Sequence, residues 1–119
     1  MEALYIEDNL IEQRLMTLYM GDLGIKLHIA GTGSEGWTMA HKVFPSFIMM
    51  DMGMPDMDGE TLLKLLKADH RLRHIPLIVI TANLLIDRKL NIWDMGVVGC
   101  VIKPVSKSRL ADLLKQLFP

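Results

Sequence analysis

The sequence predicts an α/β fold of three layers, in which helices cover both faces of a five-stranded parallel sheet. Short apolar runs alternate with longer segments of helical period, and this alternation repeats five times along the chain. The 119 residues, of which 50% are apolar, supply one packed core and too little for two. We therefore expect a single domain over residues 1–119, with no output or catalytic domain attached.

Five apolar runs are too short and too apolar to form amphipathic helices, and we predict them as buried strands. They are Ala3–Ile6, Ile25–Ala30, Ser46–Met50, Leu77–Ile80 and Gly99–Ile102. Sequential right-handed crossovers between such strands give a doubly wound sheet. The pattern alone leaves both of the common strand orders open.

The segments between these runs have the apolar spacing that is typical of helices packed on a sheet. The predicted helices are Leu10–Gly21, Glu35–Phe44, Glu60–Asp69, Ile86–Met95 and Lys107–Phe118. Near the start of four of them stands a side chain that accepts hydrogen bonds from a first helical turn. The predicted N-caps are Asp8, Ser34, Asp58 and Ser106.

Composition excludes several classes of function. With 13 Lys and Arg against 14 Asp and Glu, the chain has no basic footprint for nucleic acid or for an anionic membrane. The single cysteine, Cys100, excludes an internal disulfide and a cysteine-built zinc site, and it fits a reducing compartment. No apolar run approaches the length of a membrane span, and there is no signal peptide. We expect a cytoplasmic protein.

Reactive residue types follow four of the five predicted strands, where ligands bind in open α/β sheets. They are Glu7 and Asp8 after the first strand, Asp51 after the third, Thr81 after the fourth, and Lys103 with Pro104 after the fifth. Three converging carboxylates carry a charge of about −3, which mutual repulsion disfavours unless cations are present. Lys103 supplies one positive charge, and an oxygen-only site of this kind suits Mg²⁺.

This set of residues matches the requirements of phosphoryl transfer to a carboxylate. Such a transfer depends on positioning and on neutralising charge at the phosphoryl oxygens. We expect Asp51 to be the nucleophile, Glu7 and Asp8 to hold the metal, Lys103 to pair with the incoming charge, and Thr81 to bond a phosphoryl oxygen. Each residue alone is explained better by a structural role such as a turn or a helix cap, and it is their joint placement at four strand ends that favours the functional interpretation.

At this point the sequence resembles the response-regulator receiver domain, the phosphoacceptor module of two-component signalling. Residues 4–9, Leu-Tyr-Ile-Glu-Asp-Asn, are similar to the family's first strand and acidic pair. Residues 51–59, Asp-Met-Gly-Met-Pro-Asp-Met-Asp-Gly, are similar to its phosphoacceptor loop. Thr81-Ala82 resembles its switch hydroxyl and the small residue behind it, and Lys103-Pro104 begins 22 residues after Thr81, as in typical members.

The resemblance covers essentially the whole chain and implies a flavodoxin-like fold of strand order 2-1-3-4-5 with five helices. It implies a Mg²⁺ site made by Glu7, Asp8, Asp51 and the backbone carbonyl of Gly53, and a cis bond before Pro104. The implied phosphodonor is a phosphohistidine on a sensor histidine kinase or on a histidine phosphotransfer protein.

The implied output is a population shift of the face formed by the fourth helix, fifth strand and fifth helix, which binds a downstream partner or a second copy of the chain. Such a domain catalyses only its own phosphorylation and dephosphorylation, so we expect a switch and not an enzyme. Direct contacts with nucleic acid or with a membrane are not expected.

Two positions depart from the family pattern. Cys100 stands where receivers usually carry a switch aromatic, three residues before Lys103, and we expect it to pack as a small side chain. Gly53 stands where many members have a polar residue that tunes hydrolysis, which leaves Asn83 as the candidate for orienting water.

Two alternatives stay open. Residues 31–36, Gly-Thr-Gly-Ser-Glu-Gly, match the G-x-G-x-x-G pattern of dinucleotide-binding turns, with Asp51 following Gly31 by 20 residues. Glu35 would add a negative charge beside a bound pyrophosphate, and the reactive residues at the other strand ends would have no role. The second alternative is a pseudo-receiver that keeps the fold as an interaction domain without being phosphorylated.

Overall fold

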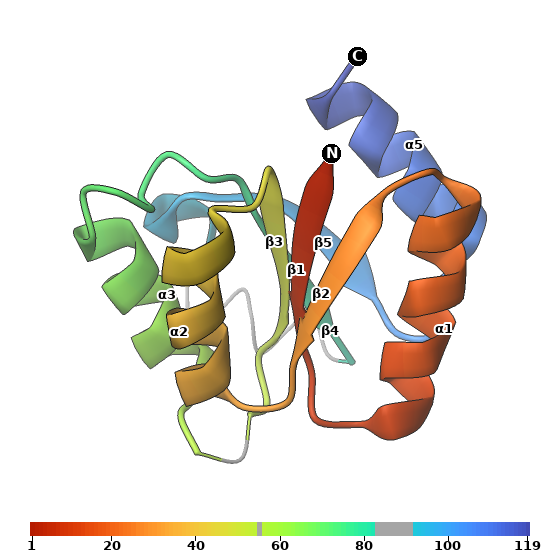
Figure 1. Cartoon of the computed structure of the whole chain (residues 1–119). Coiled ribbons are helices and arrows are strands. Elements are labelled where there is room, and N and C mark those ends of the chain that lie inside the picture. The colour runs from red at the N-terminus through yellow and green to blue at the C-terminus, as the bar shows by residue number, and fades with distance from the viewer. Residues whose placement is uncertain (55, 83–91) are drawn as a thin grey trace.

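Five parallel strands form the central layer of the structure, a computed structural model that describes residues 1–54, 56–82 and 92–119 (Figure 1). The strands are β1 (Glu2–Ile6), β2 (Lys26–Ala30), β3 (Phe47–Asp51), β4 (Leu77–Thr81) and β5 (Val97–Ile102). They lie in the order β2-β1-β3-β4-β5, and every neighbouring pair is parallel. The predicted order 2-1-3-4-5 is therefore confirmed, and strand ends differ from the prediction by at most two residues.

The described residues contain four α-helices, two on each face of the sheet (Figure 1). Helices α1 (Leu10–Asp22) and α5 (Lys107–Leu117) cover one face, and α2 (Gly33–Val43) and α3 (Gly59–Ala68) cover the other. This arrangement confirms the three predicted layers. Both chain ends lie at the edge of the sheet where the strands begin, opposite the edge at which they end (Figure 1).

The fourth predicted helix, Ile86–Met95, lies mostly outside the described residues. Its described end, Ile92–Met95, is a 3-10 helix, η1, where an α-helix was predicted. The backbone N–H of Gly96 donates to the carbonyl of Trp93 at 3.2 Å, and Gly96 has a φ of 89°. Only glycine adopts this backbone conformation without strain, so the chain turns tightly here and enters β5 at once.

Two of the four predicted N-caps are confirmed and two are wrong. Asp58 and Ser106 cap α3 and α5 as predicted. Helix α1 is capped by Asn9, whose side chain accepts from the Glu12 N–H at 3.0 Å, because α1 begins one residue later than a cap at Asp8 requires. Helix α2 is capped by Thr32, because Ser34 already lies inside that helix.

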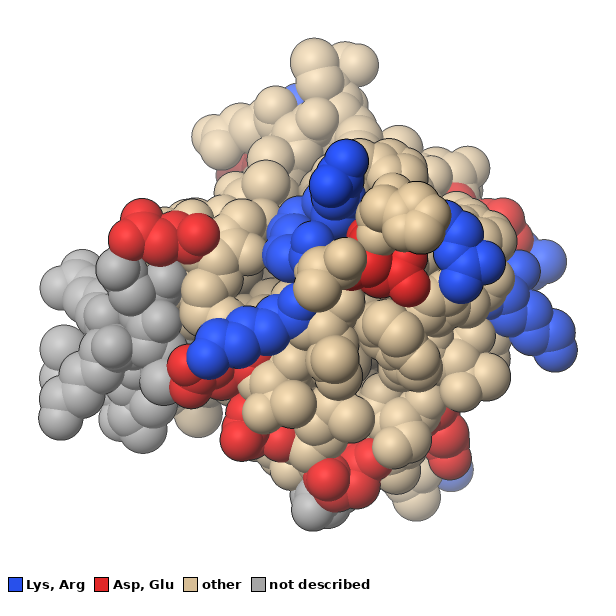
Figure 2. Space-filling view, turned by 90° about the vertical axis from the view of Figure 1, so that its left-hand side faces the viewer, with Lys and Arg blue, Asp and Glu red and all other residues tan. Residues whose placement is uncertain are grey.

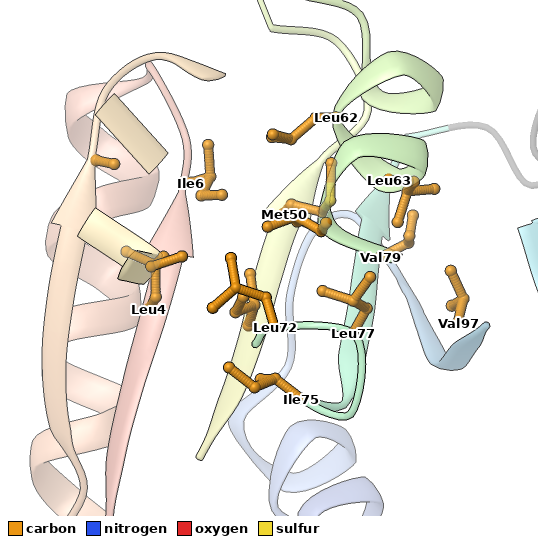
Figure 3. Close-up of a cluster of buried hydrophobic side chains, with 14 of the residues drawn as sticks. Leu4, Ile6, Met50, Leu62, Leu63, Leu72, Ile75, Leu77, Val79 and Val97 are labelled. Carbon is orange, nitrogen blue, oxygen red and sulfur yellow. The ribbon is translucent and has the colours of Figure 1, made fainter. Parts of the chain in front are cut away.

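Two apolar clusters, one on each face of the sheet, hold the layers together. Alternate residues of β1 point to opposite faces: Leu4 and Ile6 join the cluster under α2 and α3, and Tyr5 joins the one under α1 and α5. Figure 3 shows side chains of β1, β3, β4 and α3 meeting in the first cluster, among them Ile6, Met50 and Leu63. Because these strands are buried on both faces, they are apolar almost throughout.

The second helix packs unusually close to the sheet. A Cβ atom added at Gly36 would lie 2.5 Å from the Ile6 Cδ1 atom, so only glycine fits between α2 and β1 without a shift of Ile6.

On the side of the molecule where α2 and α3 lie, basic and acidic side chains are interspersed over the visible described surface (Figure 2). Within the described ranges, none of the helices is long and apolar enough to cross a membrane.

Candidate active site

The strand register brings the predicted site residues together at one edge of the sheet. Ile6 pairs with Met50 across β1 and β3, so the next residues, Glu7 and Asp51, leave the sheet side by side. Asp51 in turn pairs with Ile80 of β4, the residue before Thr81. On the other side of β4, the backbone N–H of Lys103 donates to the carbonyl of Thr81 at 2.8 Å. The ends of four strands, β1, β3, β4 and β5, therefore bring a hydroxyl, an ammonium and two carboxylates to one place.

Lys103 is the centre of the site. Its Nζ atom donates to Asp51 Oδ2 at 3.0 Å, to Glu7 Oε1 at 2.9 Å and to Glu12 Oε2 at 2.7 Å. An ammonium group has three N–H donors, so these carboxylates use all of them. The predicted convergence of Glu7, Asp51 and Lys103 is observed as direct contacts.

Glu12 is a residue that sequence reasoning missed. It lies in the first turn of α1, four residues after Asp8, where Asn9-x-x-Glu12 has the spacing of a capping box. That pattern predicts a local role at the end of the helix. The overlooked signal is that this helix end lies beside the carboxyl ends of the strands, so a first-turn carboxylate can reach Lys103.

The Glu7 carboxylate is almost completely buried, with 1% of the residue exposed. The hydroxyl of Tyr5 donates to its Oε1 atom at 3.2 Å, and the backbone N–H of Asp8 donates to Oε2 at 3.0 Å. Burial, together with the neighbouring carboxylates Glu12 and Asp51, raises the pKa of Glu7 to about 8 against the opposing effect of Lys103. In this arrangement Glu7 holds a proton at neutral pH unless another cation arrives.

Asp51 and Lys103 show the opposite behaviour. Burial disfavours the charge on Asp51, yet the Gly53 N–H, 3.1 Å from Oδ1, and the Lys103 ammonium outweigh burial and hold the pKa of Asp51 below its usual value. Burial likewise disfavours the charge on Lys103, but its three carboxylate partners raise its pKa above the ordinary value. Asp51 is therefore an ionised carboxylate with both oxygens held in place.

Three of the carboxylates could hold a metal ion. Glu7, Asp8 and Asp51 each offer one oxygen, and these oxygens lie within 4.8 Å of one another. Asp8 is exposed, and within the described part of the chain no hydrogen bond to its carboxylate is seen, so it is available as a ligand. Carboxylates with room for water are the donors that Mg²⁺ prefers, so this donor set fits the predicted ion. The role of the Gly53 carbonyl stays a prediction.

The site opens to solvent through a depression of about 690 Å³, which Asp51 and Lys103 line together with the exposed apolar residues Leu10 and Ile11 of α1.

Thr81 is buried at the end of β4, and Ala82 after it is exposed. The peptide bond between Lys103 and Pro104 is cis, as predicted. Asn83, the candidate for orienting water, lies outside the described residues.

Cys100 packs as predicted for a small side chain. It lies in β5, paired with Val79 of β4, and contacts the cluster of buried side chains under α2 and α3. A position that usually carries a switch aromatic is therefore part of the packing in this chain.

The glycine-rich segment does not present a free anion site. The carboxylate of Asp56 accepts hydrogen bonds from the N–H groups of Gly33 and Ser34, at 2.8 and 3.1 Å, and from the Ser34 hydroxyl at 2.8 Å. A pyrophosphate in a dinucleotide site would need this same helix N-terminus. Glu35 also accepts from the Gly31 N–H at 2.9 Å, so the chain's own carboxylates occupy the turn and disfavour the nucleotide alternative.

Comparison with known proteins gives a consistent result. The family described as the response regulator receiver domain matches residues 3–115. The chemotaxis protein CheY of Pseudomonas aeruginosa is 30% identical over 119 residues, which cover 99% of this chain and 96% of that protein. The polar-differentiation response regulator DivK of Brucella ovis is 30% identical over 113 residues, which cover 95% of this chain and 92% of DivK.

Solved structures agree with this result. The chemotaxis response regulator CheY4 of Vibrio cholerae has the same fold, with a TM-score of 0.90 and 21% identity over 98% of each chain. The receiver domain of the sensor histidine kinase PA1611 of Pseudomonas aeruginosa has a TM-score of 0.88 and 26% identity, covering 97% of this chain and 94% of that one. That structure has a magnesium ion coordinated in its active site cleft.

Proposed function

The chain belongs to the response regulator receiver family, and from this membership and the geometry of the pocket we propose that Asp51 is its phosphoacceptor. The phosphoryl group comes from a phosphohistidine on a sensor histidine kinase or on a histidine phosphotransfer protein. Receiver domains are signalling modules and not conventional enzymes, so the product of this chemistry is the phosphorylated domain itself. We place its action in the cytoplasm, a reducing compartment that suits a chain with a single free cysteine.

The observation that carries the proposal is the position of Asp51. It is a partly buried, ionised carboxylate, and separate donors hold its two oxygens: Lys103 at 3.0 Å and the Gly53 N–H at 3.1 Å. In the transfer, a carboxylate oxygen of Asp51 forms a bond to phosphorus as the bond from phosphorus to the donor imidazole nitrogen breaks. The imidazole leaves with the bonding electrons and is then protonated.

The surrounding residues have separate roles in this step. Lys103 neutralises negative charge on the phosphoryl oxygens, and the Thr81 hydroxyl donates a hydrogen bond to one of them. Glu7, Asp8 and Asp51 hold Mg²⁺, which when bound supplies further neutralisation of the phosphoryl charge. The later loss of the phosphoryl group to water returns the domain to its first state.

The surface supports a protein as the phosphodonor. Leu10 and Ile11 are 67% and 76% exposed at the rim of the pocket, so a donor that covers them buries apolar area as its histidine reaches Asp51. For the output face, the described residues near β5 include exposed Trp93, Val98 and Ile102. These side chains support partner binding beside the predicted fourth helix, most of which lies outside the described residues.

Intact-mass spectrometry after incubation with Mg²⁺ and acetyl phosphate tests the proposal. We expect one phosphoryl adduct that EDTA prevents and that D51N lacks. The matched control D22N loses the same charge on the exposed side chain of Asp22, at the far end of α1, and keeps the adduct. A folded parent that gains no adduct, from acetyl phosphate or from a cognate kinase, would favour the pseudo-receiver alternative.

A further inference from the structure

Among the three carboxylates that bind Lys103, Glu12 is distinct in position and environment. Its contact with the ammonium is the shortest of the three, at 2.7 Å. The Glu12 side chain is 33% exposed, compared with 1% for Glu7 and 15% for Asp51. Glu12 is also not one of the three residues whose oxygens cluster as metal ligands. Although its contact is short, Glu12 is the most exposed of the three and lies outside the group of metal ligands, so it is the partner that Lys103 can exchange most easily.

Glu12 does not serve its helix as a capping residue. In a capping box its carboxylate would accept from the backbone N–H of Asn9. In this structure the Asn9 N–H points instead to Glu7 Oε2, at 3.4 Å, while Glu12 turns toward Lys103. A conventional role at the helix end therefore leaves the contact with Lys103 unexplained.

The Lys103 contacts have a consequence for phosphoryl transfer. All three N–H donors of Lys103 are in use, so a phosphoryl oxygen that binds the ammonium must displace one carboxylate. Glu7 is buried, Asp51 is partly buried and both are needed near the metal, whereas Glu12 is the most exposed of the three and can turn into solvent. Until it turns away, its negative charge lies at the entrance of a pocket that must admit an anionic donor.

We propose that Glu12 is a positioning residue that competes with the phosphoryl group for Lys103 and thereby slows phosphorylation of Asp51. This inference rests on the proposed function. The same carboxylate draws Mg²⁺ toward the pocket, because it adds negative charge and takes one of the three N–H donors of Lys103 that would otherwise face the metal ligands. Glu12 therefore lowers the rate of phosphorylation and raises the affinity of the pocket for Mg²⁺.

The test compares E12Q, E12D and D22N with the parent. Gln has the shape of Glu without its charge, Asp keeps the charge on a shorter side chain, and D22N removes a charge far along the same helix. Phosphorylation by acetyl phosphate is followed by intact mass at saturating Mg²⁺, and Mg²⁺ affinity is measured separately by titration calorimetry. Melting temperatures verify that each variant is folded.

We expect E12Q to react roughly 3- to 10-fold faster than the parent and to bind Mg²⁺ several-fold more weakly, with E12D and D22N close to the parent. High salt should reduce the difference, because it screens the charge at this open pocket. A purely structural role predicts that rate and affinity fall together in E12Q.

Equal or slower reaction of E12Q, or equal acceleration by E12D, would overturn the role of Glu12 while leaving Asp51 as phosphoacceptor. A parent that binds Mg²⁺ and gains no adduct would overturn the proposed function, and the role of Glu12 with it.

Discussion

The carboxylates in the pocket and those that cap the helices on the other face are in opposite electrostatic situations. In the pocket, Glu7, Glu12 and Asp51 share the single ammonium of Lys103, and Asp8 lies beside them. On the other face, each carboxylate has donors of its own. These are Asp56 on the N-terminus of α2, Asp58 on that of α3, and Asp69, which binds His41 Nε2 at 2.6 Å and the Arg71 N–H at 2.8 Å.

The pKa directions express this difference. His41, the Thr61 N–H and the Ser34 hydroxyl hold the pKa values of Asp69, Asp58 and Asp56 below the usual range. Burial among like charges instead raises the pKa of Glu7 to about 8. Carboxylates that stabilise the fold are therefore matched one by one with donors. The pocket, in contrast, has more carboxylates than cations, and this excess of negative charge favours the binding of a further cation.

The largest expected effect comes from removing the cation that the pocket carboxylates share. K103M leaves Glu7 and its neighbours without a counter-ion, and we expect the free energy of unfolding of the metal-free protein to fall by about 3 kcal/mol at pH 7.5. Urea unfolding in EDTA measures this. K107M, which breaks the exposed pair with Asp22, is the control and should change little. Equal effects of the two variants would contradict the picture of a shared cation.

Magnesium should stabilise the folded protein because it binds the pocket and not the unfolded chain. At 100 times its dissociation constant, the gain in free energy of unfolding is about 2.7 kcal/mol. Thermal unfolding with and without Mg²⁺ measures it. D69N should keep the whole gain, since Asp69 lies far from the pocket, whereas E7Q should lose most of it. A gain that E7Q retains would show that the ion binds elsewhere.

The raised pKa of Glu7 predicts a pH dependence of opposite sign to that of the helix-capping carboxylates. Between its ordinary value near 4.5 and about 8, the folded state holds a proton that the unfolded state has released. The metal-free protein should therefore lose stability as pH rises through this window, with a slope of up to about 1.4 kcal/mol per pH unit. Urea unfolding at several pH values measures the slope, and E7Q, which mimics the protonated form, should flatten it. An unchanged slope in E7Q would assign the titration to another group.

The smallest effect is expected at the helix-capping carboxylates. D69N weakens the contact with His41, and we expect the melting temperature to fall by a few degrees with no change in phosphorylation rate. Because the pKa of Asp69 is lowered, its contribution is present above pH 4 and is lost as pH falls through its folded-state pKa. Calorimetry at pH 7 and pH 3 checks both points. A change in phosphorylation rate would show that this side of the molecule is coupled to the pocket.

Sequence reasoning correctly predicted the strands and the residues at their ends. It failed where the direction of a side chain depends on tertiary contacts. Strand order fixes which strand ends are neighbours, so the approach of Glu7, Asp51 and Lys103 could be predicted from their positions at strand ends together with the order that the family resemblance implied. Glu12 has the spacing of a capping residue, and only the packing of α1 beside β1 turns its carboxylate toward Lys103. The caps at Asp8 and Ser34 were wrong for a related reason, because shifts of a helix start by one or two residues leave no clear mark in the sequence.

The carboxylate of Asp56 binds the first turn of α2, where a free anion would otherwise bind, so the chain itself supplies the ligand of this helix end. A tethered ligand acts at a high effective concentration, so a free anion would have to displace a competitor that never diffuses away. The turn thus has the glycine pattern of a phosphate-binding loop, but its N–H groups are already bonded to carboxylates of the chain. Replacing Asp56 by alanine would free the N–H groups of Gly33 and Ser34 for an external anion. Asp56 is therefore the position from which to engineer an anion sensor on the face opposite α1 and α5.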